Sequence, residues 1–278
     1  MIHCKELNTS FETKEELFKA LKANKQLIID AKKSEVYHSY AKGIGVNCNQ
    51  GSIVKMLEAS KNIDIDDNYY YFVVNSSNIL DSHKDVHLNG NWEKTVKEQQ
   101  GRVYLVFDHK LQRSEIVAMK EDIEMFTETI PFSAIGKNYQ GDTYCLIYKV
   151  RKDKIQNKEA KDWLDKGYSF EASVRMQYTD IVLCLNSELE EDKRERENYD
   201  KYYPLIANKE EFEDVNYFWG VKQAKNVMES SLVMFGSNSA TGLIQENKYE
   251  PSKDTQENKE AVKNDTSDII NFYNSIKF

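Results

Sequence analysis

The segment that decides the fold is Tyr168-Ser-Phe-Glu-Ala-Ser-Val-Arg-Met-Gln-Tyr178, in which apolar and polar residues alternate without interruption. The even positions carry aromatic, Ala, Val and Met side chains, and the odd positions carry Ser, Glu, Arg and Gln. A period of two is typical of a strand with one buried face. We therefore expect a β-strand over residues 168–178, with Ser169 and Ser173 on its polar, substrate-accessible face.

Other short segments have the same β-rich composition and are separated by turn-forming or charged residues. They are Tyr69 to Val74, Arg102 to Phe107, Ile123 to Ile130, Thr143 to Val150 and Ile181 to Leu185. The aromatic content of 12%, with 17 Tyr and only 3 Pro, also favours strands. The sequence predicts an α+β, β-rich fold.

Three segments predict helices. Thr13-Lys-Glu-Glu16 has capping-box spacing and is followed by a helical apolar stripe, so we expect an amphipathic helix over residues 13–33. A second helix is expected over 157–166, with Gly167 ending it, and a third near 218–226. The charge-dense segment Glu188 to Tyr203 predicts a solvated insertion.

The composition bounds the class of protein. A net charge of −8 argues against nucleic acid as a partner. The four cysteines have no paired short spacing, which favours reduced thiols over a zinc site or a disulfide framework. The N-terminus does not resemble a signal peptide, and no run approaches the roughly 18 apolar residues of a spanning helix. No membrane association and no cofactor are expected.

Changes in composition divide the 278 residues into three parts. Residues 1–65 form an N-terminal arm, whose helix either binds a partner or covers the core, and residues 40–65 predict a mobile connection. Residues 66–243 form the main domain. Residues 244–278 form a flexible tail that ends in the apolar segment Ile269–Phe278, either a docking motif or a helix that folds back.

Three residues far apart in sequence could divide the work of nucleophilic catalysis. Ser173 would attack, His109 at the end of Val103 to Phe107 would take its proton, and Glu229 would orient the imidazole. Alternation places Glu229 on one face with Ser231 and Val233. Each residue also has a more ordinary interpretation, because most strand serines and loop histidines are simply solvated.

A competing interpretation comes from Asp81-Ser-His-Lys-Asp-Val-His87, where potential metal ligands recur at every second residue. One tetrahedral ion could not use all four, since alternate residues of a strand lie roughly 6.6 Å apart. A metal-dependent hydrolase would use His83, Asp85 and His87 together with His109. The alternative is a turn followed by an edge strand.

Four blocks together resemble the prohead proteases of tailed phages, serine peptidases related in fold to herpesvirus assemblin. Ser77 to Trp92 is similar to the early Asp-containing segment of the family, and Val103 to His109 to its strand ending in the catalytic histidine. Gly167 to Met176 is similar to the nucleophile block, and Glu229 to Ala240 to the Glu-Val-Ser-Leu-Val segment. The chain departs from the family where Val174 and Arg175 follow the serine in place of a small residue and Gly, and where Lys84 replaces Gly.

The resemblance implies an assemblin-like core, a closed or partly closed β-barrel or sheet with a few surrounding helices. It implies a serine endopeptidase with the triad His109, Ser173 and Glu229, acting inside the assembling prohead in the host cytoplasm. Its substrates would be scaffold segments, the major capsid protein and the protease itself. Ser169 remains the substitute nucleophile, and the oligomeric state is open, a homo-oligomer included. A catalytically impaired, protease-like assembly or scaffolding component is the alternative function.

Overall fold

The computed structural model describes residues 1–38, 46–60 and 65–233. All of these residues belong to one compact unit, Met1–Thr241. The expected tail 244–278, with Ile269–Phe278 and the sites of expected self-cleavage, lies outside the described residues.

The two longest strands, β11 and β12, pair antiparallel and form the middle of a seven-stranded sheet in the order β3-β11-β12-β7-β8. The short strand β4 also pairs with β11, and β6 pairs with β12. Both β6 and β7 run parallel to β12, one after the other along its edge. The strands of this sheet are β3 (Val36–His38), β4 (Val46–Asn47), β6 (Asp85–His87), β7 (Tyr104–Phe107), β8 (Ile116–Ala118), β11 (Glu171–Leu185) and β12 (Tyr217–Val233).

A second, antiparallel sheet has the order β5-β10-β9, and a two-stranded sheet pairs β1 with β2. Their bounds are β1 (Ile2–Cys4), β2 (Thr9–Phe11), β5 (Tyr69–Ser76), β9 (Ile123–Pro131) and β10 (Asp142–Arg151). Strands β5, β7, β9 and β10 confirm the four strands expected near 69–74, 102–107, 123–130 and 143–150. The fold is mixed α+β and strand-rich as expected, but the strands in the described ranges form open sheets, not a closed barrel.

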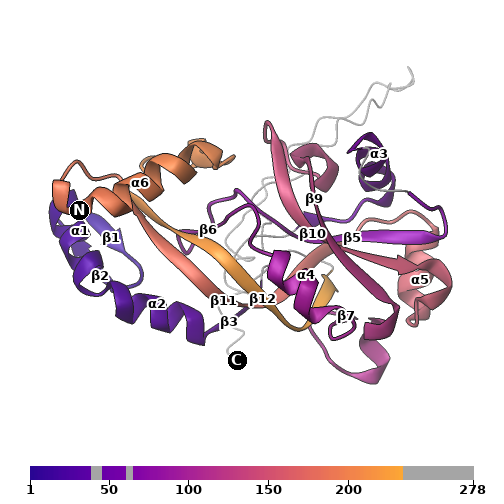
Figure 1. Cartoon of the computed structure of the whole chain (residues 1–278). Coiled ribbons are helices and arrows are strands. Elements are labelled where there is room, and N and C mark those ends of the chain that lie inside the picture. Colours follow the sequence, from indigo (N-terminus) through magenta and orange to yellow (C-terminus); the bar gives the residue numbers. More distant parts are fainter. Residues whose placement is uncertain (39–45, 61–64, 234–278) are drawn as a thin grey trace, which may run out of the picture. The chain divides into compact units, whose positions relative to one another are not determined.

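Six α-helices occur in the described part of the chain: α1 (Lys14–Ala23), α2 (Lys25–Ser34), α3 (Gln50–Ser60), α4 (Glu93–Gln99), α5 (Lys158–Asp165) and α6 (Lys193–Tyr202). In Figure 1, β11 and β12 run from the end of the sheet near α1, α2 and α6 toward the side that holds β5, β9 and β10. Short 3-10 helices are η2 (Arg113–Glu115), η3 (Lys120–Asp122), η4 (Phe132–Ile135), η5 (Lys152–Lys154), η6 (Glu190–Asp192), η7 (Tyr203–Leu205) and η8 (Lys209–Glu211).

The N-terminal helical segment differs from the single helix expected over 13–33. Its start is as predicted, because the Thr13 side chain accepts a hydrogen bond from the Glu16 backbone amide. The helix ends at Asn24, however, where φ is −104° and ψ is 8°, and α2 begins at the next residue. Helix α3 also occupies part of the expected connection 40–65.

Helix α5 confirms the prediction for 157–166. The Asn157 side chain accepts a hydrogen bond from the Ala160 amide at 3.0 Å and so caps the first turn. Gly167 follows the last turn with φ at 77°, a left-handed conformation that glycine adopts without steric cost. Leu164 is buried, and Trp163 packs against the core.

The helix expected near 218–226 is wrong, because these residues belong to β12. Tyr217 to Val221 are all buried, since one face contributes Trp219 to the main core while the other contributes Phe218 to a smaller cluster under α6. Burial of both faces removes the alternation that identifies a strand. Gly220 relieves crowding here, because a Cβ atom would lie 3.0 Å from Leu88 Cδ1 and 3.2 Å from Val182 Cγ2, and these side chains would have to shift.

The segment 188–203 is exposed over much of its length, as its charge predicts, but it forms η6 and α6 and buries two of its carboxylates. Asp192 and Glu195 are buried and form ion pairs with Lys22 at 2.6 Å and Lys25 at 2.5 Å. Tyr199 packs against Phe218 of β12. Partners from α1 and α2 therefore offset the cost of burying these carboxylates. None of the described helices is long and apolar enough to cross a membrane.

Candidate active site

The pairing of β11, β12 and β7 brings Ser173, His109 and Glu229 together. Ser173 lies directly opposite Ser231 in the antiparallel pair, and Glu229 lies opposite Tyr104 in the parallel pair. After β7 ends, the Asp108 amide donates a hydrogen bond to the Leu232 carbonyl at 3.1 Å. His109 therefore follows a strand that is fixed alongside the other two residues.

The imidazole of His109 links the serine to the carboxylate. Its Nε2 lies 2.8 Å from Ser173 Oγ, and its Nδ1 lies 2.8 Å from Glu229 Oε1. Both distances are within hydrogen-bond range. With a proton on Nδ1, the imidazole donates to Glu229, and Nε2 is left to accept the serine proton. This geometry could activate a serine nucleophile.

His109 sits in a tight turn with an unusual backbone. Asp108 has φ at 46° and His109 has φ at 55°, and the Lys110 amide donates to the Phe107 carbonyl at 2.9 Å across the turn. Two successive positive φ values are disfavoured for residues other than glycine. Strained backbone of this kind is often found at functional sites.

Glu229 is placed by an irregularity in β12. Val174 pairs with Ser230 and Met176 with Asn226, so three residues of β12 lie opposite the single residue between them on β11. Met228 has φ at 70° within this bulge, and its side chain is exposed while Glu229 is fully buried. Bulges commonly redirect side chains next to active sites.

A buried polar cluster connects both ends of the bulge to β10. The Asn226 side-chain amide donates to Tyr148 Oη and, at 3.0 Å, to Ser230 Oγ, while Ser230 Oγ lies 2.9 Å from Tyr148 Oη. Burial, with a smaller contribution from the charge of Glu229, raises the pKa of Tyr148 well above its ordinary range. Tyr148 is therefore neutral at physiological pH and can take part in this cluster as donor or acceptor.

The three groups are almost completely shielded from water. Ser173 and Glu229 have no exposed area, and the His109 side chain is 5% exposed. Glu229 Oε2 has no hydrogen-bond partner in the described part of the structure. A carboxylate held against Nδ1 would stabilise the positive charge that develops on an imidazole as it takes a proton from a serine.

Two expectations about the serines need correction. Ser173 is buried rather than open on a solvated face. The strand begins at Glu171, so Ser169 precedes it in an exposed loop, and His109 Nε2 contacts Ser173. The two expected strands 168–178 and 181–185 are one strand, whose register shifts near Asp180.

The segment Asp81 to His87 forms a turn and then β6. This agrees with the alternative interpretation of a turn followed by a strand. The Lys84 amide donates to the Asp81 carbonyl at 3.0 Å, and Lys84 has φ at 59°. Asp81 Oδ1 accepts the amides of His83 and Asp85 at 2.8 and 2.9 Å. The Asp81 carboxylate therefore stabilises the turn.

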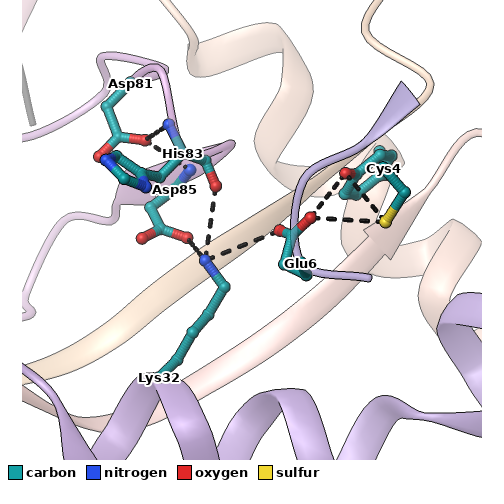
Figure 2. Close-up of polar contacts among 7 residues, drawn as sticks. Cys4, Glu6, Lys32, Asp81, His83 and Asp85 are labelled. Atoms are coloured by element: carbon teal, nitrogen blue, oxygen red, sulfur yellow. Dashed lines mark hydrogen bonds and ion pairs between the residues drawn. The ribbon is translucent and has the colours of Figure 1, made fainter. Parts of the chain in front are cut away.

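The other side chains of this segment serve two separate clusters. Figure 2 shows the buried Lys32 of α2 between Asp85, the His83 carbonyl and Glu6. Burial lowers the pKa of Lys32, but the charges of Asp85 and Glu6 outweigh it and leave the pKa raised. His87 lies elsewhere, with Nδ1 2.9 Å from Asn91 Nδ2 and its ring against Trp92.

No metal-binding constellation is formed by the residues that the structure describes. No group of three or more His, Cys, Asp or Glu side chains is placed to hold an ion in these ranges. His109, the fourth ligand proposed with His83, Asp85 and His87, is engaged with Ser173 and Glu229.

Several residues around the triad were not predicted to contribute to it. Ser231 Oγ accepts the His109 backbone amide at 2.9 Å. Its place on the same face as Glu229 in the strand alternation was the available signal. The cluster of Tyr148, Asn226 and Ser230 had no such signal, because it depends on the bulge and on contact with another sheet.

No protein-family model, curated protein or solved structure matches this chain.

Proposed function

We propose that this chain is a serine endopeptidase. One observation carries the proposal: His109 bridges Ser173 Oγ and Glu229 Oε1, with 2.8 Å on each side. Three residues from three different strands or strand ends meet in the order that proton transfer requires. The left-handed backbone at His109 and Met228 adds support, because conformations that cost stability persist where the surrounding structure requires them.

In the proposed mechanism, Ser173 Oγ attacks the carbonyl carbon of the scissile peptide bond as its proton passes to His109 Nε2. Glu229 holds the imidazole through Nδ1 and stabilises the imidazolium. The tetrahedral intermediate collapses when His109 returns the proton to the leaving amine, which leaves an acyl group on Ser173. Water activated by the same imidazole then releases the acid and regenerates the serine.

The resemblance to prohead proteases extends the proposal to substrates, partners and place of action. On this basis the chain cleaves scaffold segments, the major capsid protein and itself within an assembling prohead in the host cytoplasm, and its core is assemblin-like. Lys84 supports the likeness in one respect: it has φ at 59°, a conformation that suits the glycine often found there in the family.

The proposal is tested with the purified full-length chain and a fluorescently labelled, unfolded polypeptide such as casein. Wild-type protein should release labelled peptides, and Ser173→Ala should not, while a chelator should have no effect. Mass spectrometry of the protein itself should show loss of C-terminal residues from wild type alone. Equal loss from purified Ser173→Ala would contradict the proposal.

A second candidate is a protease-like assembly component with impaired catalysis. Two observations favour it: Ser173 has no exposed area, and Val174 and Arg175 follow it where a small residue and Gly would give a more open oxyanion site. Wild-type and His109→Ala chains should then support equal processing of co-expressed capsid protein. Faster processing with wild type favours the peptidase.

A further inference from the structure

The backbone that presents His109 is held at three successive amides. The Asp108 amide donates to the Leu232 carbonyl at 3.1 Å, and the Lys110 amide donates to the Phe107 carbonyl at 2.9 Å. The His109 amide between them donates to a side chain, Ser231 Oγ, at 2.9 Å. The turn that carries the imidazole therefore depends on one hydroxyl group at its centre.

The Ser231 hydroxyl is well suited to accept this hydrogen bond. Ser231 is fully buried, and its Oγ lies 3.2 Å from the Val106 carbonyl and 3.1 Å from its neighbour, the Leu232 carbonyl. The hydroxyl proton can go to either carbonyl, which leaves an oxygen lone pair for the His109 amide. Without the hydroxyl, that amide would lose its partner, and the left-handed φ of 55° at His109 would lose a restraint.

Ser231 also links this turn directly to the nucleophile. It lies opposite Ser173 in the register of β11 and β12, so the two residues occupy the same face of the sheet. One residue thereby fixes the histidine backbone in relation to the strand that carries the serine. An error of about 1 Å in this relation can reduce a catalytic rate about 100-fold.

We infer that Ser231 is a positioning residue: its hydroxyl holds the His109 backbone in the conformation that lets the imidazole reach Ser173 and Glu229 together. This inference rests on the proposed function, because it assigns a role within the same site. Ser231 acts through His109 and contacts no reacting atom.

The matched variants are Ser231→Ala, which removes the acceptor, and Ser231→Thr, which keeps it. The control is Ser187→Ala: Ser187 is also buried, and its hydroxyl also accepts a backbone amide, that of Leu189 at 3.3 Å. Reaction with a small fluorophosphonate should slow about 10- to 100-fold in Ser231→Ala. We expect little change in the probe concentration that gives half-maximal rate. Ser231→Thr should recover most of the rate, and Ser187→Ala should match wild type.

Amide hydrogen exchange of the same proteins tests the positioning role without relying on catalysis. The His109 amide should exchange at least about 10-fold faster in Ser231→Ala than in wild type, while amides in the middle of β10 keep their protection. If wild type fails to react with the probe but this change appears, the positioning role stands and the proposed function fails. Unchanged protection of His109, or a wild-type labelling rate in Ser231→Ala, would overturn the inference.

Discussion

Two of the buried carboxylates, Glu229 and Asp85, each bind a side-chain nitrogen, and they do so in different ways. Glu229 contacts the imidazole of His109, whereas Asp85 contacts the ammonium of Lys32. Both carboxylates are fully buried. His109 Nε2 contacts Ser173 Oγ and can accept a proton from it, while the raised pKa of Lys32 keeps it charged.

The backbone around the two pairs differs as well. Positive φ values at Asp108, His109 and Met228 surround the first pair. In the second pair, Lys32 lies in the regular helix α2 and Asp85 in strand β6, with one positive φ value at the preceding Lys84, and Glu6 adds a further carboxylate at 3.7 Å from the lysine. Under the proposed function, the first pair serves proton transfer, whereas the second holds helix α2 on the sheet.

Replacement of His109 should give the largest difference between the Glu229–His109 pair and the Asp85–Lys32 pair. In His109→Ala the rate of peptide hydrolysis should fall about 10⁶-fold, since the imidazole that would take the proton of Ser173 Oγ is removed. The free energy of unfolding should change less than it does when Lys32 is replaced. Hydrolysis assays and urea denaturation measure both quantities. Residual hydrolysis within 10-fold of wild type would show that the imidazole is not the base.

Glu229→Gln should sharpen the comparison, because it keeps the shape of the side chain and removes its charge. We expect the hydrolysis rate to fall about 10⁴-fold, because an amide cannot hold the imidazole in the required tautomer and stabilise its charged form. Stability should be unchanged or slightly higher, as a buried charge with an unsatisfied oxygen is lost. A large loss of stability at a normal rate would assign Glu229 a structural role.

Lys32→Met should produce the opposite pattern. Removing the ammonium leaves Asp85 and Glu6 buried without their cation, so the free energy of unfolding should fall by about 3–5 kcal/mol. The labelling rate of the folded fraction should stay at the wild-type value. Lys14→Met is the control, because the Lys14–Asp214 pair is exposed and should contribute no more than about 1 kcal/mol. Equal effects from the two variants would contradict the structural role.

The same pair has a defined pH dependence. The pKa of Lys32 is raised above its ordinary value of 10.5 in the folded chain. Its contribution to stability is therefore fully present below that value and is lost as the pH rises through the higher folded value. The stability difference between wild type and Lys32→Met should accordingly be present at neutral pH and shrink in strongly alkaline solution. A difference that disappears near neutral pH would contradict this assignment.

Tyr148→Phe should have the smallest effect, because it acts on Glu229 through the bulge. The hydroxyl that contacts Asn226 and Ser230 is lost, and leaving these buried groups less satisfied should cost about 1–3 kcal/mol. The hydrolysis rate should fall less than 10-fold. Tyr71→Phe is a matched control, since Tyr71 is buried and its hydroxyl accepts the Asp66 amide away from the site. A greater loss of activity in Tyr71→Phe than in Tyr148→Phe would contradict a role of Tyr148 in positioning Glu229.

Strands with one buried face and helices with local caps could be predicted from the sequence. The strand β11 followed from its alternation and α5 from Asn157 and Gly167. Prediction from the sequence failed where contacts between residues far apart in the chain determine the structure. The start of β12 is buried on both faces, and Asp192 of η6 and Glu195 of α6 are buried because Lys22 and Lys25 pair with them.

The same limit applies to the candidate site. The residue types and order of His109, Ser173 and Glu229 were visible, and the resemblance grouped them. The positive φ values at His109 and Met228 could not be predicted, because neither residue is a glycine. The role of Ser231 depends on a turn and a strand meeting across the sheet, which local sequence does not encode.

The most direct test of the central claim is labelling of the full-length chain with a fluorophosphonate, followed by peptide mass spectrometry to identify the modified residue. The account predicts one adduct on Ser173 in wild type, with no adduct in Ser173→Ala and almost none in His109→Ala. An adduct on Ser169, or equal labelling of wild type and His109→Ala, would contradict the account.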